Sequence, residues 1–248
     1  MSEITNLPDH VAIILDGNRR WARGKELQDE DGHRKGIETL VLIAKAAAKF
    51  NIKYLTLFSF SKENWKRDPS EISNLMDLME SFESEYLDEI ILNNIRVTVI
   101  GDIDTLAKPQ KKIIKMVQER TCGNTGMQLI AAFNYSGRDE IIRAVKKIVN
   151  DVKLAKISAD MINNDLMGNY LDTANIPDPD LIIRTSGEMR LSNFLLWQCA
   201  YSEFIFTDTF WPDFTVDHFH NALEQYSQRE RRYGRNTPMR GCELDYGY

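Results

Sequence analysis

The sequence has few of the features by which secreted, membrane-spanning and zinc-binding proteins are recognised. Its three cysteines, Cys122, Cys199 and Cys242, form no CxxC pair, so we expect neither a thioredoxin motif nor a zinc ribbon. An odd and sparse cysteine count is typical of a reducing compartment. The first ten residues contain no continuous apolar segment, and no apolar run is long enough to cross a bilayer. We therefore expect a cytoplasmic protein without a signal peptide.

Several common catalytic and nucleotide-binding motifs are also missing. The sequence contains no GxxxxGK[ST] loop and no GxGxxG fingerprint, so nucleotide binding in those two modes is not expected. HExxH and GxSxG are absent as well. The net charge is −6 at pH 7. A protein that binds nucleic acid without sequence preference needs a strong positive field, so we expect no nucleic-acid partner.

What the sequence does contain is ample material for one folded domain. Hydrophobic residues make up 43% of its 248 residues and charged residues 27%, which is typical of a globular chain with a large core. Short, continuously apolar runs predict strands covered on both faces, at 10–15, 54–60, 96–100, 128–133 and 180–183, with a sixth at 204–206. Because helical patterns alternate with these runs, we predict one α/β domain over 1–234, with about six mostly parallel strands flanked by helices. Residues 235–248 form a tail without periodicity, expected to be flexible.

Four segments carry the apolar spacing of helices. Apolar residues recur at intervals of three and four along 37–48. The residues at 68–71, Asp-Pro-Ser-Glu, predict a helix start, because they supply a cap, a first-position proline and a first-turn carboxylate. The helix that they open has an apolar stripe over 72–90. Further helices are predicted from 136 onward and from about 215 to near 234.

Polar residues follow three of the predicted strands directly. The first strand is followed by DGNRRW at 16–21, the second by SKENWKR at 61–67 and the fifth by RTSGEMRLSN at 184–193. Because ligands bind beyond the carboxyl ends of parallel strands, we expect these segments to meet at one edge of the sheet. Arginine suits bidentate contacts to phosphate oxygens, and a carboxylate in a phosphate site commonly holds Mg²⁺. Together the segments predict a site for one or two diphosphates.

Each of these features also has an ordinary structural interpretation. An aspartate at a strand end often only caps the next helix, and a single arginine is usually a solvated surface charge. The apolar stripe of 72–90 is more often core than ligand tunnel. What favours a functional site is the concentration of residues at three strand ends: Asp16, Asn18, Ser61 and the arginines Arg20, Arg67, Arg184 and Arg190.

Long segments of the chain resemble the cis-prenyltransferase family, most of all its bacterial undecaprenyl diphosphate synthases. The segments are HVAIILDGNRRWA, the Gly-His pair at 32–33, LTLFSFSKENWKR, IRTSGEMRLSNFLLWQCAYSEFIFTDTFWPDF and RERRYG. The resemblance implies a homodimer that uses Mg²⁺ to condense isopentenyl diphosphate with an allylic diphosphate, usually farnesyl diphosphate. The expected product is a long-chain cis-polyprenyl diphosphate such as undecaprenyl diphosphate, a carrier lipid of cell-wall synthesis. Releasing such a lipid implies peripheral membrane contact.

The resemblance also implies roles for individual residues. Asp16 matches the aspartate that positions Mg²⁺, and Ser61 and Asn64 match residues linked to condensation and proton removal. The residues expected at the allylic substrate are Gly17, Asn18, Arg19, Arg20, Trp21 and His33. The residues expected at isopentenyl diphosphate are Arg67, Arg184, Arg190 and Ser192, with Ser61, Glu63 and Trp65 in the supporting loop. Glu203 is expected at the metal and the subunit contact, and Arg231 and Arg232 at the dimer interface.

Three positions differ from the commonest family pattern. Arg19 stands where many bacterial members have glycine, although an Arg-Arg form is also familiar in the family. Asp29 stands where the family usually has an arginine, and a carboxylate there repels a diphosphate. Either Arg19 or Arg23 compensates, or the allylic substrate binds weakly. Met189 occupies a position that is a histidine near the metal in some members, so we expect a metal held by Asp16 and diphosphate oxygens. The expected tunnel wall is the 72–90 helix with residues 46–48 opposite.

Two other functions stay open at this point. VAIILD followed by glycine resembles the strand-end nucleophile of an aspartyl phosphatase, but Asn18 stands where that chemistry needs a second aspartate. The other function is that of a non-catalytic subunit in a cis-prenyltransferase heteromer. Such subunits lack the aspartate and much of the phosphate site, whereas Asp16, Asn18 and Arg184 are all present here.

Overall fold

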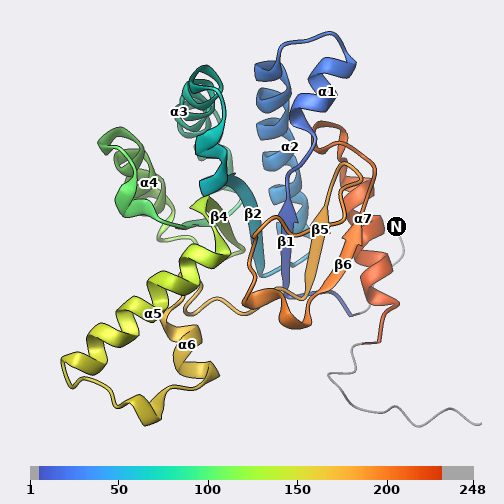
Figure 1. Ribbon diagram of the computed structural model, residues 1–248. Coiled ribbons are helices and arrows are strands. Elements are labelled where there is room, and N and C mark those ends of the chain that lie inside the picture. Colours follow the sequence, from blue (N-terminus) through green and yellow to red (C-terminus); the bar gives the residue numbers. More distant parts are fainter. Residues whose placement is uncertain (1–5, 231–248) are drawn as a thin grey trace, which may run out of the picture.

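Six parallel strands form one sheet in the computed structural model, which describes residues 6–230 (Figure 1). The strands are β1 (His10–Ile14), β2 (Tyr54–Ser61), β3 (Arg96–Ile100), β4 (Gln128–Tyr135), β5 (Leu181–Arg184) and β6 (Glu203–Phe206). They lie in the order β3-β4-β2-β1-β5-β6, and every adjacent pair is parallel. The predicted α/β fold class is confirmed, and each predicted strand is present with small shifts at its ends.

β1 is an inner strand, and the sheet extends from it on both sides. β2, β4 and β3 follow on one side, and β5 and β6 on the other. β1 pairs with both β2 and β5, so the carboxyl ends of these three strands are neighbours. Such a reversal of strand order is where doubly wound sheets hold ligands. The segments 16–21, 61–67 and 184–193 therefore start from a common edge.

Seven α-helices and five short 3₁₀ turns connect the strands in the part of the chain that the structure describes. The α-helices are α1 (Asn18–Gly24), α2 (Asp29–Lys49), α3 (Pro69–Leu92), α4 (Lys108–Thr121), α5 (Gly137–Lys153), α6 (Asn164–Tyr170) and α7 (Val216–Ser227). The 3₁₀ turns are η1 (Lys62–Lys66), η2 (Ile103–Thr105), η3 (Ala159–Met161), η4 (Gln198–Tyr201) and η5 (Trp211–Asp213).

The helix ends agree only partly with the sequence patterns. α3 begins as predicted, because the Asp68 side chain accepts the Ser70 N–H at 2.9 Å and Pro69 takes the first position. The last helix was predicted to run to near 234 but ends at Ser227. The predicted domain end at 234 and the tail 235–248 lie outside the described residues.

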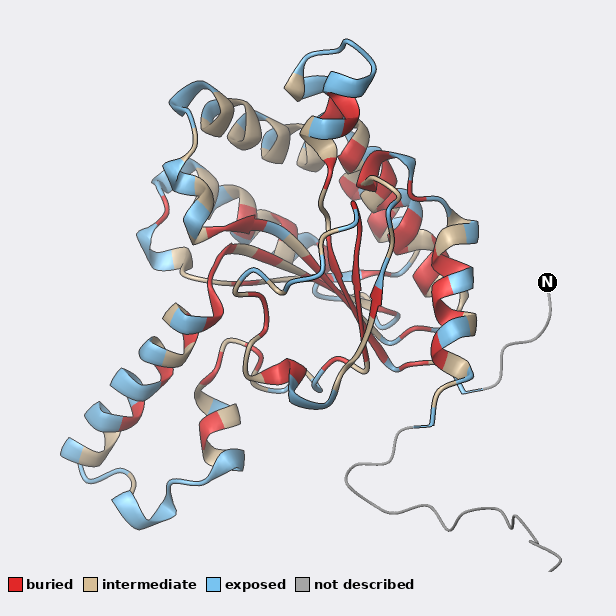
Figure 2. Ribbon diagram, turned by 45° about the vertical axis from the view of Figure 1, so that its right-hand side comes forward, coloured by how far each residue is buried: buried red, intermediate tan, exposed pale blue. Residues whose placement is uncertain are grey.

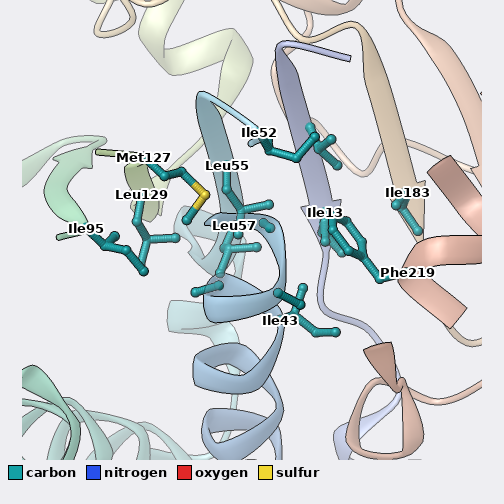
Figure 3. Close-up of a cluster of buried hydrophobic side chains, with 14 of the residues drawn as sticks. Ile13, Ile43, Ile52, Leu55, Leu57, Ile95, Met127, Leu129, Ile183 and Phe219 are labelled. Atoms are coloured by element: carbon teal, nitrogen blue, oxygen red, sulfur yellow. The ribbon is translucent and has the colours of Figure 1, made fainter. Parts of the chain in front are cut away.

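Apolar side chains cover both faces of the sheet. Adjacent strand residues point to opposite faces, so Val11 belongs to a core cluster with Ile43 of α2 and Phe219 of α7, whereas Ala12 belongs to a second cluster with Phe194. Figure 3 shows part of the first cluster between the strands and these helices. Buried residues follow the strands and the inward helix faces in Figure 2. The expectation of strands covered on both faces is thus confirmed.

α5 and α6 form an arm that projects from the sheet (Figure 1). The arm has a small core of its own, made of Ala144, Ile148, Met167 and Leu171. The other side of α5 leaves apolar residues partly exposed, namely Ile142 at 54%, Val145 at 46% and Val149 at 45%. Among residues 6–230, no helix combines the length and apolar character needed to span a membrane.

His10 makes the stability of this fold depend on pH. Its Nδ1 lies 2.6 Å from the Pro177 carbonyl oxygen and its Nε2 lies 2.7 Å from the Thr56 hydroxyl, inside the core. Burial lowers the pKa of His10 from 6.5 to about 4. The unfolded chain therefore binds the proton first, and stability is lost as the pH falls from 6.5 towards 4.

We expect this one side chain to cost about 2 kcal/mol of unfolding free energy between pH 7.5 and pH 5. Urea unfolding of the wild type and of His10→Asn measures it, because asparagine keeps a donor but does not titrate. The wild type should lose more stability than the variant over this interval. Equal losses in the two proteins would show that His10 does not carry the effect.

Candidate active site

A cavity of about 870 Å³ opens at the carboxyl edge of β1, β2 and β5. One part of its lining is polar and comes from the segments after these strands and from α1. The predicted site residues in this part are Asp16, Gly17, Asn18, Arg19, Arg20, His33, Ser61, Glu63, Asn64, Arg67, Arg184 and Ser192. The structure therefore brings together most of the residues that the three strand ends predicted.

The rest of the cavity is apolar and extends between α3 and α4 over the sheet. Val97 and Leu129 near the starts of β3 and β4 line it, so it reaches away from the polar edge. The apolar helix residues that line this part are Ile37 and Leu40 of α2, Leu75, Leu78, Met79 and Phe82 of α3, and Ile113, Ile114 and Val117 of α4. The α3 wall agrees with the prediction. The predicted opposite wall at 46–48 is wrong, because these alanines pack in or against the core cluster. α2 lines the cavity about two turns earlier, through Ile37 and Leu40, and α4 supplies a further wall.

Asp16 is held between two guanidinium groups. Its Oδ2 accepts from Arg184 Nη2 at 2.8 Å, and its Oδ1 accepts from Arg20 Nη2 at 3.3 Å. Burial opposes ionisation of Asp16, but the hydrogen bond and charge of Arg184, aided by Arg20, lower the pKa of this carboxyl below its usual value. Thr185 fixes the backbone here by donating to the Asp16 carbonyl oxygen at 2.6 Å. An ionised carboxylate thus sits at a fixed position in a cationic rim.

The turn after Asp16 requires glycine. Gly17 has a φ of +107°, and a Cβ atom there would lie 2.7 Å from the Phe210 ring. The chain can therefore turn directly from β1 into α1, which brings Asn18, Arg19 and Arg20 to the cavity.

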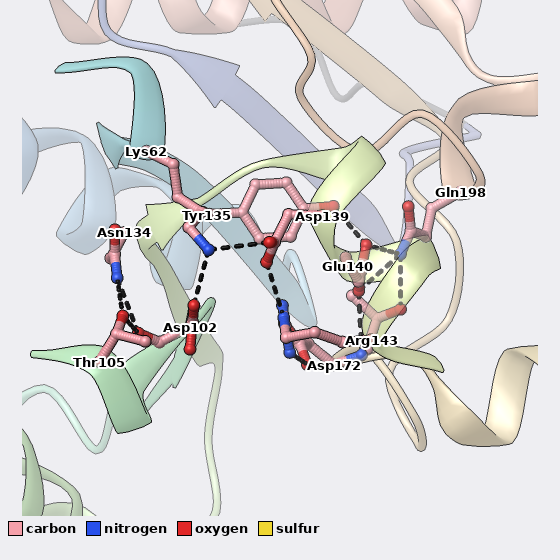
Figure 4. Close-up of polar contacts among 11 residues, drawn as sticks. Lys62, Asp102, Thr105, Asn134, Tyr135, Asp139, Glu140, Arg143, Asp172 and Gln198 are labelled. Atoms are coloured by element: carbon pink, nitrogen blue, oxygen red, sulfur yellow. Dashed lines mark hydrogen bonds and ion pairs between the residues drawn. The ribbon is translucent and has the colours of Figure 1, made fainter. Parts of the chain in front are cut away.

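The segment after β2 is anchored on both sides. Asn64 Oδ1 accepts the Ser61 N–H at 3.0 Å within η1, and Trp65 Nε1 donates to Asn134 Oδ1 at 2.8 Å. Lys62 donates to Asp102 at 2.6 Å and to Asp139 at 2.8 Å, which ties the segment to β3 and α5 (Figure 4). These contacts hold Ser61 and Asn64 at the cavity.

A buried polar network supports the segment after β5. Gln198 Nε2 donates to the Glu140 carboxylate at 3.1 and 3.2 Å, and Tyr135 Oη donates to the same carboxylate at 2.5 Å (Figure 4). Burial raises the pKa of Glu140. Glu63 Oε1 accepts from Asn193 Nδ2 at 2.7 Å, so the segments after β2 and β5 are joined directly.

Two carboxylates that the sequence patterns missed arrange the arginines. Glu71 accepts from Arg67 Nη1 at 2.9 Å and from Arg19 Nη1 at 3.2 Å. Glu188 accepts from Arg20 Nη1 at 3.1 Å and also pairs with Arg190. Glu71 lies in the first turn of α3 and Arg67 in the extended segment just before that helix, so the contact depends on the turn into α3 and no local sequence pattern predicted it.

Buried nitrogen atoms without hydrogen-bond partners indicate an anionic ligand. Trp21 Nε1, His33 Nε2 and Arg184 Nε have no such partner among the described residues, and His33 and Arg184 line the cavity. Buried polar atoms are normally hydrogen-bonded. Burial, and then the charge of Arg67, lower the pKa of His33. A ligand in the cavity that is rich in acceptor oxygens would satisfy the His33 and Arg184 nitrogens.

Four predicted site residues lie outside the cavity lining. Trp21 is buried under Lys25, whose Nζ lies 4.4 Å from the ring centroid, and Trp65 supports the η1 segment. Arg190 has a 60% exposed side chain that pairs with Glu188. Glu203 begins β6, at the opposite edge of the sheet from Asp16.

In the single chain, the Glu203 Oε2 accepts from Arg229 Nη1 at 2.8 Å, and Glu203 does not line the cavity. Its expected role at the metal and the subunit contact stays a prediction. Arg231 and Arg232, expected at a dimer interface, lie outside the described residues.

The donor set fits a metal ion that is bound mainly through its substrate. Within residues 6–230, no group of three or more histidine, cysteine and acidic side chains is arranged to hold a metal. Asp16 and Glu63 are the carboxylates among the described residues that line the cavity. Mg²⁺ commonly binds through one or two carboxylates, with substrate phosphates and water completing its shell. Asp16 beside a cationic rim matches that mode.

Comparisons with known proteins agree with this site. A family model described as "Putative undecaprenyl diphosphate synthase" matches residues 14–234. An isoprenyl transferase of Agrobacterium fabrum is 49% identical over 230 residues, covering 93% of each chain. One of Clostridium perfringens is 49% identical over 228 residues, covering 92% of this chain and 90% of the relative.

Two solved structures are similar as well. Lavandulyl diphosphate synthase from Lavandula x intermedia, in complex with dimethylallyl diphosphate, has a TM-score of 0.89 at 35% identity, covering 92% of this chain and 98% of that one. A chain described as a probable undecaprenyl diphosphate synthase from Campylobacter jejuni has a TM-score of 0.77 at 33% identity, covering 93% and 100%.

Proposed function

The chain belongs to the undecaprenyl diphosphate synthase family of prenyltransferases, and we propose that it condenses isopentenyl diphosphate with an allylic diphosphate in a Mg²⁺-dependent reaction. Farnesyl diphosphate is the proposed allylic primer, and a long-chain cis-polyprenyl diphosphate, undecaprenyl diphosphate, is the proposed product. Such a product would serve as a carrier lipid in cell-wall synthesis.

The observation that carries the proposal is the two-part cavity. Five arginines line its polar part, namely Arg19, Arg20, Arg23, Arg67 and Arg184. Guanidinium groups bind phosphate oxygens in bidentate fashion. The apolar part between α3 and α4 suits a hydrocarbon chain. A diphosphate head joined to an apolar tail matches both parts at once.

The two diphosphates are proposed to bind on different sides of the polar part of the cavity. Asn18, Arg20 and His33 lie with Asp16 on the α1 and α2 side, which we assign to the allylic substrate. Arg67, Arg184 and Ser192 lie on the side of the β2 and β5 segments, which we assign to isopentenyl diphosphate. Arg184 joins the two, since it donates to both Asp16 and Ser192 at 2.8 Å.

The chemistry requires the allylic carbon–oxygen bond to break while the isopentenyl double bond attacks the allylic carbon. Asp16 would hold a Mg²⁺ ion, which would supply positive charge near the departing diphosphate. Arg20 and Arg184 stabilise the same charge without reorganising, because Asp16 and Ser186 already fix them. Ser61 and Asn64 orient isopentenyl diphosphate beside the allylic carbon.

A proton then leaves the new cation to complete the double bond. Ser61 and Asn64 are not bases at neutral pH, and the Asp16 carboxylate would be bound to the metal as well as to its two arginines. The departing diphosphate is therefore the proposed proton acceptor. The apolar lining excludes water, which would otherwise quench the cation.

Incubation with farnesyl diphosphate, labelled isopentenyl diphosphate and Mg²⁺ tests the proposal. We expect label in a long-chain lipid diphosphate, with release of diphosphate. Release of inorganic phosphate without a labelled lipid would favour the phosphatase. Absence of both from the purified chain would favour the non-catalytic subunit.

The length of the product tests the apolar cavity. Phe82 lies on α3 and lines the cavity, so Phe82→Trp fills part of the space for the growing chain. Each buried CH₂ favours elongation by about 0.8 kcal/mol until the cavity is full. We expect shorter products on a chromatogram, by one or more five-carbon units. An unchanged product length would remove Phe82 from the wall.

Homodimer formation is supported by the exposed apolar residues on α5, which lie on one face of the arm. Burying such a face in a subunit contact removes it from water. Sedimentation of the full chain is expected to give twice the 28.7 kDa of one chain. A mass of one chain at micromolar concentration would exclude a stable dimer.

The proposed location is the cytoplasm, with peripheral membrane contact when the apolar product is released.

A further inference from the structure

Arg23 lines the same cavity as the proposed diphosphate ligands, although the family pattern gives it no role. It lies in the last turn of α1. Residues three and four apart are neighbours on a helix surface, so Arg23 follows Arg20 and Arg19 along one side of α1. Its side chain is 61% exposed. A solvated surface charge is the ordinary interpretation of such an arginine.

The contacts of Arg23 argue against a freely moving surface charge. Arg23 Nε donates to Asp29 Oδ1 at 2.9 Å, and Arg23 Nη2 donates to Asp29 Oδ2 at 2.8 Å. Arg19 Nε donates to the same Oδ2 at 2.9 Å. One carboxylate therefore receives three N–H groups from two guanidiniums. Immobilising a long side chain costs conformational entropy. Because Asp29 already holds the two arginines, this entropy is lost on folding and not on ligand binding.

Both guanidiniums keep an unused nitrogen. Among the described residues, Arg23 Nη1 and Arg19 Nη2 make no hydrogen bond. Arg19 also pairs with Glu71, which Arg67 contacts in turn. Arg19, Arg23 and Arg67 carry three positive charges and Asp29 and Glu71 two negative charges, so the group has a net charge of +1 at the rim. The carboxylate at position 29 thus faces the arginines, which leaves the cluster cationic and attractive to an anion.

We propose that Arg23 is a further ligand of the allylic diphosphate, held in place by Asp29. The inference rests on the proposed function and on the assignment of the α1 side to the allylic substrate. In this chain Arg23 supplies the cationic contact that a carboxylate at position 29 does not.

Binding of farnesyl thiolodiphosphate, an unreactive analogue, measures the contact by calorimetry with Mg²⁺ present. A charge-assisted hydrogen bond is worth enough that Arg23→Met should raise the Kd about tenfold or more. Lys25→Met is the matched control, because it removes one positive charge just beyond the same helix without touching the cavity lining. The control should change the Kd by less than about twofold.

The background Asp29→Asn separates a direct contact from mere neutralisation of Asp29. If Arg23 binds the diphosphate, Arg23→Met still raises the Kd about fivefold or more when Asp29 has lost its charge. If Arg23 only neutralises Asp29, the second substitution changes nothing, and the proposal is overturned. The KM for isopentenyl diphosphate should stay within about twofold in all variants, and a larger rise would also overturn it.

The proposed function fails separately from this inference. A wild type that binds the analogue and makes a labelled lipid upholds the function, whatever Arg23→Met does. If the wild type does neither, the proposed function is contradicted, whatever Arg23→Met does.

Discussion

Replacing Asp16 with asparagine is expected to lower the condensation rate by at least about 100-fold. The substitution keeps the shape of the side chain and its capacity to accept a hydrogen bond from Arg184. It removes the one carboxylate that lies between Arg184 and Arg20 at the polar edge. The proposed Mg²⁺ ion would then lose its protein ligand.

Single-turnover kinetics with farnesyl diphosphate and labelled isopentenyl diphosphate measure this effect over a range of Mg²⁺ concentrations. Asp213→Asn is the control, because Asp213 is exposed and pairs loosely with Lys25 at 3.7 Å. The control should react like the wild type. A near-normal turnover by Asp16→Asn would contradict the assignment of the metal ligand.

Replacing Arg184 with methionine is expected to raise the KM for isopentenyl diphosphate by about 100-fold. Arg184 is only 4% exposed, and it donates to Asp16 and Ser192 and to the Arg190 carbonyl oxygen. No neighbouring group can take over three such contacts. The substitution also lowers stability, but by less than the roughly 3–5 kcal/mol that breaking a fully buried ion pair costs, because Asp16 is partly exposed and keeps its contact with Arg20.

Arg184→Lys keeps the buried positive charge. This variant therefore separates a loss of substrate binding from a loss of folding. A lysine ammonium is a point charge that cannot reproduce the planar fork of a guanidinium. We therefore expect a high KM in this variant as well, with a thermal midpoint close to that of the wild type. If only the affinity for the allylic substrate changed, the two diphosphate sides would be exchanged.

The sheet and the polar edge could be predicted from sequence because both follow from local patterns. The apolar runs of the strands are continuous, since both faces are covered. Parallel pairing then places Asp16, the η1 segment and Arg184 at the same edge without further information. This is why most of the predicted site residues line one cavity.

Other features depend on contacts that no local pattern contains. α1 and α6 have seven residues each, too few for a clear periodicity. α4 is rich in lysine and glutamine, so its short apolar stripe gave no signal, and the second wall of the cavity was misplaced. The sequence left open whether Arg19 or Arg23 compensates for the charge of Asp29, and tertiary contacts pair Asp29 with both arginines.

The role of Glu203 was predicted by motif, and the single chain does not test it. Its segment matches the family closely, but the strand register places it level with Leu181 at the start of β5, away from the carboxyl edge. Arg190 similarly belongs to the right segment but turns its side chain to Glu188. A motif identifies the segment, whereas the fold decides which side chains reach the cavity.

The most direct test of the account is an experimental structure of the chain with farnesyl thiolodiphosphate, isopentenyl diphosphate and Mg²⁺. We expect both diphosphates within hydrogen-bond reach of the rim arginines, with the metal between Asp16 and the allylic diphosphate. The farnesyl chain should run between α3 and α4 past Phe82. Diphosphates bound elsewhere, or a farnesyl chain outside this cavity, would contradict the account.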